Sequence, residues 1–261
     1  MESSLENIKT FIFCDETKFY KNNGDIEDEI YYFGISCKTE LVSVIHKSLN
    51  NLYSNYRLQT KVFHATTVFK EKYPRKALMN DLTNLILHHK LDCFCFKYIK
   101  NKLFDKTKIL NKFNNPILDF NRVEFQALFY FVTSLNVYLK QQNTQLLKKE
   151  IGMFFDRNVY GVKDTEAFNF PKPDYEFNQM TFTEKSNISL LALPDFFGYI
   201  FRKSKIFTNK VDAGDKSLEA SELTKNCFAS LKSINEAGLF HFINSDEQIL
   251  IEAIKSIAQI K

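Results

Sequence analysis

Two short apolar runs that stop at acidic residues constrain this chain more than any other feature. Residues 11–14 are followed by Asp15 and Glu16, and residues 151–155 are followed by Asp156. Uninterrupted apolar runs of this length are typical of strands that are buried on both faces of a sheet. A carboxylate that follows such a strand lies at the rim of the sheet, where one cation can hold several carboxylates together. The two runs therefore predict a buried sheet with acids at one edge.

A third acid precedes the apolar stretch 196–201. Asp195 follows Pro194, a residue that favours the first turn of a helix, so a helix is expected over about 194–203. Carboxylates from two strand ends and one helix suit a divalent-metal site for phosphoryl chemistry.

The rest of the chain alternates between the periodicities of strands and helices. Strands are expected over residues 8–15, 30–37, 91–99, 151–156 and 180–183. Helices are expected over residues 41–56, 76–89, 124–140, 194–203, 218–231 and 247–260. We therefore expect an α/β fold with a central mixed sheet of about five strands.

The expected sheet opens with antiparallel pairing of residues 10–14 with residues 32–36. Parallel additions are expected from residues 91–99 and 151–156. Residues 1–210 form the expected main domain, and residues 211–261 a helical carboxyl-terminal extension packed on it.

Composition fits an intracellular globular protein. A chain of 261 residues with 44% hydrophobic and 25% charged residues can bury a substantial core. No apolar run is long enough to span a bilayer, and the amino terminus lacks the basic start and apolar segment of a secretory signal. The five cysteines are odd in number and scattered, which argues against a disulfide framework. These features predict a cytoplasmic protein with no membrane partner.

The net charge of +4 is too mild to indicate nucleic acid by itself. Lysines and arginines cluster locally, and the ordinary interpretation of each cluster is a solvated helix face. The alternative is contact with a phosphate backbone, which positions a nucleic acid without reading its sequence. The candidates for such contacts are Lys18, Lys61, Lys70, Arg202 and Lys203.

Each acid also has an ordinary structural explanation. Asp15 and Glu16 suit the polar end of a strand that runs into a turn, and Asp156 could form a surface ion pair with Arg157. Asp195 falls in a first helical turn, where the helix dipole alone favours an acid. Taken jointly, and in the order in which they occur along the chain, these acids favour a shared acidic site.

His64 has two interpretations that the sequence leaves open. It suits a metal ligand or a proton shuttle near pH 7, and equally a histidine at the edge of the core. Glu124 at the start of an apolar helix could add an acid to the site, although a first-turn glutamate is ordinary capping chemistry. The chain has no glycine-rich phosphate loop, dinucleotide fingerprint or nucleophile elbow, which disfavours NTPases, dinucleotide enzymes and serine hydrolases.

The order of these motifs resembles the ribonuclease H-like family catalogued as the domain of unknown function numbered 3800. The resemblance runs over residues 8–205, through Asp-Glu-Thr at 15–17, Phe-His-Ala at 63–65, Asp156 and Leu-Pro-Asp-Phe-Phe-Gly at 193–198. Five positions, in three of the motifs, depart from the family pattern. Thr17 and Lys18 replace Ser and Gly, Val62 stands where an acid is usual, and Ala192 and Pro194 replace Gln and Ala.

The resemblance implies a ribonuclease H-like fold and a two-metal nuclease. In that fold, carboxylates from the first strand, a later strand and a late helix bind two Mg²⁺ or Mn²⁺ ions. Asp15, Asp156 and Asp195 match these positions, with Glu16 as a further ligand and His64 as a catalytic residue.

The expected activity is hydrolysis of phosphodiester bonds in RNA or DNA, in the setting of a toxin or an anti-phage defence effector. The alternative is a catalytically degenerate module that binds nucleic acid, a partner protein or a second copy of itself. Val62 and the altered residues before Asp195 favour the alternative.

Overall fold

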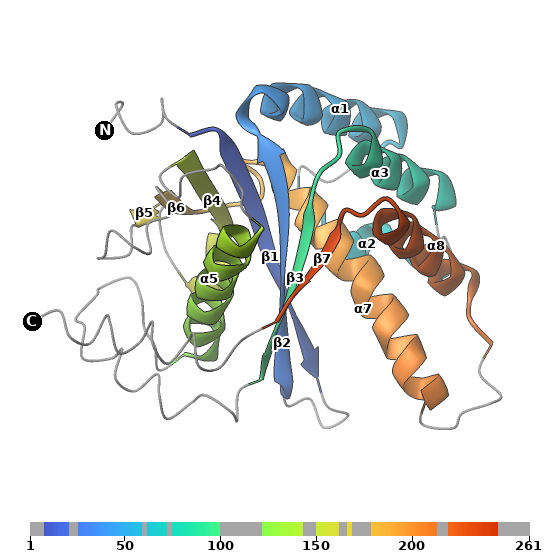
Figure 1. Cartoon of the computed structure of the whole chain (residues 1–261). Coiled ribbons are helices and arrows are strands. Elements are labelled where there is room, and N and C mark those ends of the chain that lie inside the picture. The colour runs from blue at the N-terminus through green and yellow to red at the C-terminus, as the bar shows by residue number, and fades with distance from the viewer. Residues whose placement is uncertain are drawn as a thin grey trace, which may run out of the picture.

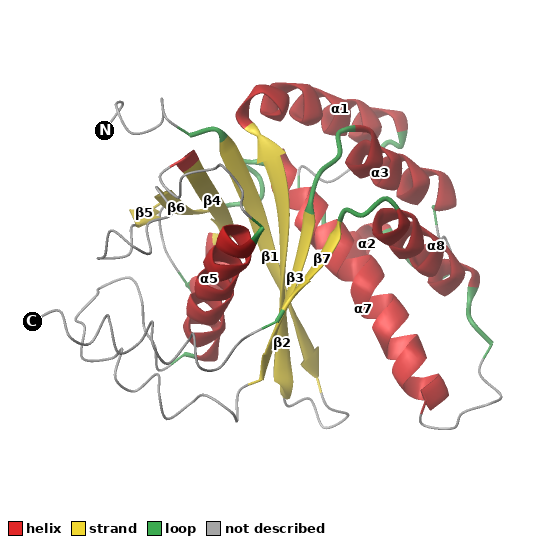
Figure 2. Ribbon diagram, viewed as in Figure 1, coloured by secondary structure: helices red, strands yellow, loops and turns green. Residues whose placement is uncertain are grey.

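The protein folds around one mixed sheet with helices on both of its faces (Figures 1 and 2). The computed structural model describes residues 8–20, 26–58, 62–71, 75–99, 122–142, 150–161, 166–168, 179–212 and 219–244. All structural statements below concern these residues. None of their helices is both long and apolar enough to cross a bilayer.

Seven strands form the sheet in the order β5-β6-β4-β1-β2-β3-β7. They are β1 (Thr10–Tyr20), β2 (Ile26–Lys38), β3 (Cys93–Ile99), β4 (Ile151–Asp156), β5 (Glu166–Phe168), β6 (Gln179–Thr183) and β7 (Phe240–Ile243). The centre is an antiparallel meander of β1, β2 and β3. Strand β4 joins β1 in parallel, β6 joins β4 in parallel, and β7 joins β3 in parallel, while β5 is antiparallel to β6.

Helices cover the two faces of the sheet unequally. They are α1 (Val42–Asn55), α2 (Ala65–Val68), α3 (Lys76–His88), α5 (Val123–Gln141), α6 (Arg157–Tyr160), α7 (Ala192–Asp212) and α8 (Glu222–Glu236), with 3-10 turns at Thr39–Leu41 and Ser189–Leu191. In Figure 1, α5 lies on one side of the sheet, whereas α1, α3, α7 and α8 lie on the other.

Two hydrophobic cores result, one on each face of the sheet. Ile12 and Cys14 pack into the core beside α5, while the intervening Phe13 packs into the core beside α7. Successive side chains of a strand point to opposite faces, so β1 must be apolar at each position from Phe11 to Cys14 to fill both cores. This burial on two faces explains the uninterrupted apolar runs of the sequence.

Helix α7 approaches the sheet closely at a glycine. A Cβ atom on Gly198 would lie 2.8 Å from Cδ2 of Phe33, a buried ring on β2. Because that distance is too short for a real Cβ contact, a larger residue would push α7 outward. Gly198 therefore sets the depth of α7 and of Asp195, which lies one turn earlier in the same helix.

The structure confirms the α/β class, the antiparallel pairing of β1 with β2 and the parallel pairing of β4 with β1. The expected register was wrong by two residues, because Thr10 pairs with Lys38 and Cys14 with Gly34. The expected parallel addition of residues 91–99 was also wrong. Strand β3 runs in the direction of β1, but it lies beside β2, whose direction is opposite.

The sequence had indicated a helical carboxyl-terminal extension, but this part of the chain also contains a strand. After α8, the four-residue strand β7 forms one edge of the sheet, and its shortness hides it from a periodicity search. Strand β5 was missed for the same reason. The expected helix over 247–260 lies outside the described residues.

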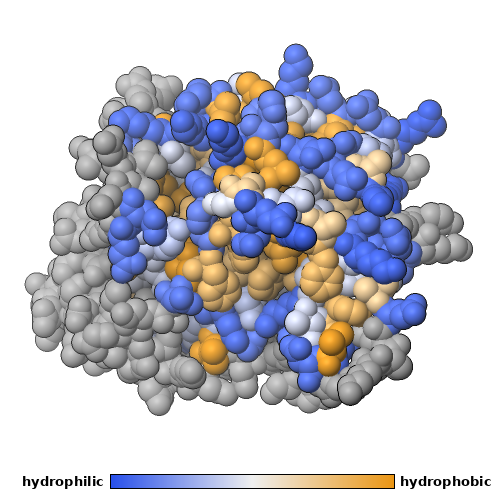
Figure 3. Space-filling model, turned by 45° about the vertical axis from the view of Figure 1, so that its right-hand side comes forward, coloured by the Kyte–Doolittle hydropathy of each residue, from blue (hydrophilic) through white to orange (hydrophobic). Residues whose placement is uncertain are grey.

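Large exposed hydrophobic residues are few among the described residues. They are Val44, Val211 and Phe242, which are 47%, 44% and 43% exposed and belong to three different elements. On the face drawn in Figure 3, hydrophobic residues gather in the middle of the view and hydrophilic residues surround them.

Candidate functional site

Asp15 lies where the parallel pairing of β1 and β4 stops. The sequence had placed it at the end of a strand, which is wrong, because β1 continues to Tyr20. The pairing with β4, however, ends at Cys14 opposite Phe155. Asp15 and Asp156 are the next residues on the two strands, and they share the face on which the rings of Phe13 and Phe154 stack at 5.4 Å. Both carboxylates therefore face α7 at one rim of the sheet.

Asp156 is buried and held in place by its own loop. Its Oδ1 accepts hydrogen bonds from the backbone N–H and the side-chain Nδ2 of Asn158, each at 3.1 Å, and so caps α6. Arg157 forms its ion pair with Glu184 instead. The surface ion pair between Asp156 and Arg157 that the sequence left open is therefore not formed.

Asp195 comes to the same rim from the first turn of α7. Its Oδ1 accepts a hydrogen bond from the backbone N–H of Ala65 at 3.4 Å. Its Oδ2 lies 3.6 Å from Nδ1 of His64, whose side chain is 52% exposed. The Phe-His-Ala segment and α7 thus meet, as the two motifs of the sequence suggested they would.

A lysine that sequence reasoning missed lies between the acids. Nζ of Lys185 is 3.0 Å from Oδ2 of Asp15, 3.0 Å from Oδ2 of Asp195 and 4.0 Å from Oδ2 of Asp156. The side chain of Lys185 is only 9% exposed. Those of Asp15, Asp156 and Asp195 are 11%, 8% and 13% exposed. Three carboxylates from β1, β4 and α7 therefore surround one ammonium group.

The turn that carries Lys185 joins β6 to α7 and is fixed by its own hydrogen bonds. The N–H of Asn187 donates to the carbonyl of Glu184 at 3.0 Å, and the amide of Asn187 donates to Oγ1 of Thr183 at 3.3 Å. Nothing in the local sequence separates this lysine from a solvated turn lysine, since Asp15 is 170 residues away and Asp195 belongs to the next helix, ten residues on.

Burial and charge act in opposite directions on the ionisable groups of the site. Burial raises the pKa of Asp15 to about 7, Lys185 opposes that rise, and the charges of Asp195 and Asp156 add to it. Burial also raises the pKa of Asp195, but hydrogen bonds from His64 and Lys185 outweigh it and hold the pKa below its usual value. Crowded like charges thus contribute to the raised pKa of Asp15, although burial is the larger cause.

Lys185 stays protonated for a related reason. Burial alone would lower its pKa, but the charges of Asp15 and Asp195 raise the pKa above its ordinary value. The hydrogen bond to Asp195 likewise raises the pKa of His64, against the opposing effects of burial and of Lys185. The site thus has the charged ammonium of Lys185 at its centre and the titratable imidazole of His64 at its exposed side.

The donor set suits a hard divalent cation, although the present arrangement is closed by Lys185. Mg²⁺ and Mn²⁺ prefer carboxylate oxygens and keep several waters, so three aspartates suffice. As the described side chains stand, no group of three or more His, Cys, Asp and Glu residues is arranged to hold a metal ion. The three carboxylates have the ligand chemistry of such an ion, but they do not form its coordination shell while Lys185 lies among them.

Glu16 is not brought to this site. It follows Asp15 on the same strand, so its side chain points to the α5 face. Its charge raises the pKa values of Tyr32 and Tyr160 there, after the larger effect of burial. Glu124 lies on the same face, where Tyr32 donates to its carbonyl oxygen. Neither Glu16 nor Glu124 therefore takes the place of the acid that the resembled family has at the position of Val62.

The candidate nucleic-acid contacts are only partly visible. The side chain of Lys18 and the whole of Lys61 lie outside the described residues. Lys70 is exposed. Nζ of Lys203 pairs with Glu71 at 2.8 Å, which joins α7 to the segment after α2. Arg202 lies beside Lys203 on α7 and is half-buried.

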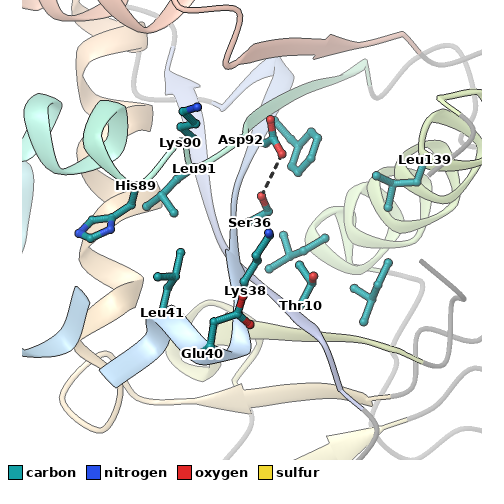
Figure 4. Close-up of a pocket in the computed structure, with 13 residues that line it drawn as sticks. Thr10, Ser36, Lys38, Glu40, Leu41, His89, Lys90, Leu91, Asp92 and Leu139 are labelled. Atoms are coloured by element: carbon teal, nitrogen blue, oxygen red, sulfur yellow. Dashed lines mark hydrogen bonds between the residues drawn. The ribbon is translucent and has the colours of Figure 1, made fainter. Parts of the chain in front are cut away.

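The cavities of the molecule differ in size and position. A cavity of about 110 Å³ adjoins Lys185 and is lined by His46, Asn50, Tyr53, Phe63, Ser186, Asn187, Ser189 and Ala192. A larger one of about 400 Å³ lies near the opposite end of β1, around Thr10, Ser36 and Asp92 (Figure 4). Asp15 is five residues further along β1, or roughly 17 Å at the rise of a strand. The predicted acids therefore do not line the larger cavity.

We compared the chain with protein-family models, curated proteins and solved structures, and none of them matches it. The resemblance drawn from its motifs therefore stays a prediction.

Proposed function

We propose that this protein is a divalent-metal-dependent phosphodiester hydrolase of RNA or DNA with a ribonuclease H-like arrangement. The observation that carries the proposal is the convergence of Asp15, Asp156 and Asp195 within 4.0 Å of one cationic nitrogen. These acids come from the first strand, a later strand and a late helix, which are the elements that the resemblance implies.

Each residue has a role in this proposal. Asp15, Asp156 and Asp195 would hold Mg²⁺ or Mn²⁺. Such ions, when bound, activate a water molecule and stabilise the leaving oxygen of a phosphodiester. His64 lies at the open side of the site with half of its side chain exposed, where it can give or take a proton. A toxin or anti-phage setting rests on the family resemblance alone.

The competing proposal is a module that binds nucleic acid or protein without cutting. Lys185 supports it, because a lysine ammonium already neutralises the carboxylates that a metal would need. Val62 supports it as well, since no acid stands at that position.

Incubation of the purified protein with labelled RNA and labelled DNA separates the two proposals. Cleavage in Mg²⁺ or Mn²⁺ that is lost in EDTA and in Asp156→Asn supports the hydrolase. Asp212→Asn, at the exposed carboxyl-terminal end of α7, is the matched control and should cut like the wild type. Cleavage that survives both EDTA and Asp156→Asn would identify a contaminant or a different mechanism. Binding without cleavage in any metal would favour the competing proposal.

A further inference from the structure

Lys185 holds a position that a metal ligated by the same acids would need. Its Nζ contacts Oδ2 of Asp15 and Oδ2 of Asp195 at 3.0 Å each. A divalent ion bound by these oxygens would lie about 2.0–2.1 Å from each of them. The ion and the ammonium would then share two oxygens at close range, and two cations repel strongly in a site with little water. Both cannot hold the site in the present arrangement.

The charge of Lys185 also has a structural purpose. Three carboxylates with 8–13% exposure at the rim of a sheet repel each other and have lost most of their hydration. The ammonium offsets part of this charge and bridges β1 to α7. Its removal would leave buried carboxylates without a counter-ion, which is a strongly destabilising state.

The structure also provides a place for a displaced ammonium. Lys185 and Tyr53 both line the cavity of about 110 Å³ between α1 and the turn after β6. The hydroxyl of Tyr53 is buried and has no hydrogen-bond partner among the described residues. A buried hydroxyl without a partner is unfavourable, so it is a ready acceptor for a lysine that turns away from the acids.

We propose that Lys185 is a built-in counter-ion of the metal-free protein, and that a divalent cation enters only when the ammonium moves to the cavity beside Tyr53. The inference rests on the proposed metal site and adds the residue that regulates its occupancy. In this scheme Lys185 and the metal exclude each other, and Tyr53 stabilises the metal-bound form.

The test is Mn²⁺ binding by calorimetry together with thermal unfolding in EDTA. Lys185→Met should bind Mn²⁺ at least about tenfold more tightly than the wild type, because the competing charge is gone. In EDTA the same variant should melt lower by roughly 6–15 °C, and Mn²⁺ should reverse the loss. Lys232→Met, which removes an exposed ion pair with Glu236 within α8, is the matched control and should change neither quantity appreciably.

Tyr53→Phe should have the opposite signature. It removes the acceptor for the displaced ammonium, so Mn²⁺ binding should weaken severalfold while the melting temperature in EDTA does not fall. Unchanged Mn²⁺ affinity in Lys185→Met, or a melting temperature in EDTA that matches the Lys232→Met control, would overturn the proposal.

A double variant keeps the test decisive if Lys185→Met does not fold in EDTA. The double variant Asp15→Asn, Lys185→Met removes one charge of each sign and should recover the folded protein, and continued failure to fold would overturn the inference.

The proposed hydrolase can fail separately from the displacement of Lys185. Tighter Mn²⁺ binding by Lys185→Met without cleavage by any form keeps the displacement and rejects the hydrolase. Cleavage by the wild type, together with unchanged Mn²⁺ affinity in Lys185→Met, keeps the hydrolase and rejects the displacement.

Discussion

Aspartates at the two ends of the central strands have different environments. At one end, the carboxylate of Asp92 is 47% exposed, and its partners are Nε2 of His241 at 3.0 Å and the hydroxyl of Ser36 at 3.4 Å. Figure 4 shows Asp92 and Ser36 joined across the wall of a cavity of about 400 Å³. At the other end, Asp15 is 11% exposed and crowded by two further aspartates around Lys185.

This difference teaches which acids require a cation. Water, His241 and Ser36 are enough for a half-exposed carboxylate such as Asp92. Three buried carboxylates at one rim are stable only with positive charge among them. The rim around Lys185 is therefore the end of the sheet that requires a cation, and Lys185 supplies it in this structure.

Substitution of one acid at each end gives the largest expected difference. Asp156→Asn should reduce metal-dependent cleavage by at least about a hundredfold, because it removes a ligand of the proposed metal. Asp92→Asn should leave the cleavage rate within about twofold, since its cavity lies at the far end of β1. Nucleic-acid binding by Asp156→Asn should persist or strengthen, because a negative charge near phosphate is lost. Rates and affinities measured on both variants check this, and equal losses of activity would remove the distinction between the two ends.

Glycines near the two ends should differ in their effect on stability. Gly198→Val places atoms against the buried ring of Phe33, and overpacking of this kind costs roughly 1–3 kcal/mol or more. It should also move Asp195 away from β1 and weaken metal binding. Gly238→Ala, before β7, meets no atom within 4 Å but must keep a φ of +71°, which costs about 1 kcal/mol.

Urea unfolding of the two glycine variants, with Mn²⁺ titration of each, measures these effects. Weakened Mn²⁺ binding in Gly198→Val alone would tie the metal site to the depth of α7. If Gly238→Ala weakened Mn²⁺ binding equally, global loss of stability would explain both results.

Two acids of the same rim should respond to pH with opposite signs. The pKa of Asp15 is raised to about 7 in the folded protein, so its protonated form stabilises the fold below pH 4, and that stabilisation is lost as the pH rises to about 7. Asp15→Asn should therefore gain stability relative to the wild type on going from pH 5 to pH 8. The pKa of Asp195 is lowered, so its contribution is present above the unfolded value near 4 and is lost on acidification.

Thermal unfolding in EDTA between pH 3 and pH 8 checks the pH prediction. Asp195→Asn should lose more stability at pH 7 than at pH 3, which is the opposite trend to that of Asp15→Asn. Parallel curves for the two variants would mean that the carboxylates do not differ in their folded-state protonation.

The smallest expected effect concerns the basic residues of α7. Charge reversal at Arg202 and Lys203 should weaken nucleic-acid binding modestly and reduce its salt dependence by about one to two counterions. The effect is limited because Lys203 is already paired with Glu71. Titrations at several salt concentrations measure it, with charge reversal at Lys210, an exposed lysine near the end of α7, as a control. Unchanged affinity at low salt would leave this surface as solvated charge and favour a protein partner.

Sequence patterns were enough for the elements whose signal is local. Strand β4 has the predicted bounds, because a continuous apolar run that ends at Asp156 needs no distant information. Helices α1, α3 and α5 were also found within a few residues, since each keeps a helical period over three turns or more. The short strands β5 and β7 were missed because three or four residues carry no period.

The sequence by itself singled out Asp15, Asp156 and Asp195 through the apolar runs beside them, although β1 continues past Asp15. It also placed Glu16 next to Asp15, and strand alternation alone separates their side chains onto opposite faces. Only the tertiary structure decided that β4 stops beside Asp15, that Gly198 lets α7 bring Asp195 to the same rim, and that Lys185 lies among the three acids. Lys185 is 170 residues from Asp15 in the chain, and contacts of that separation depend on how β1, β6 and α7 pack rather than on any local pattern.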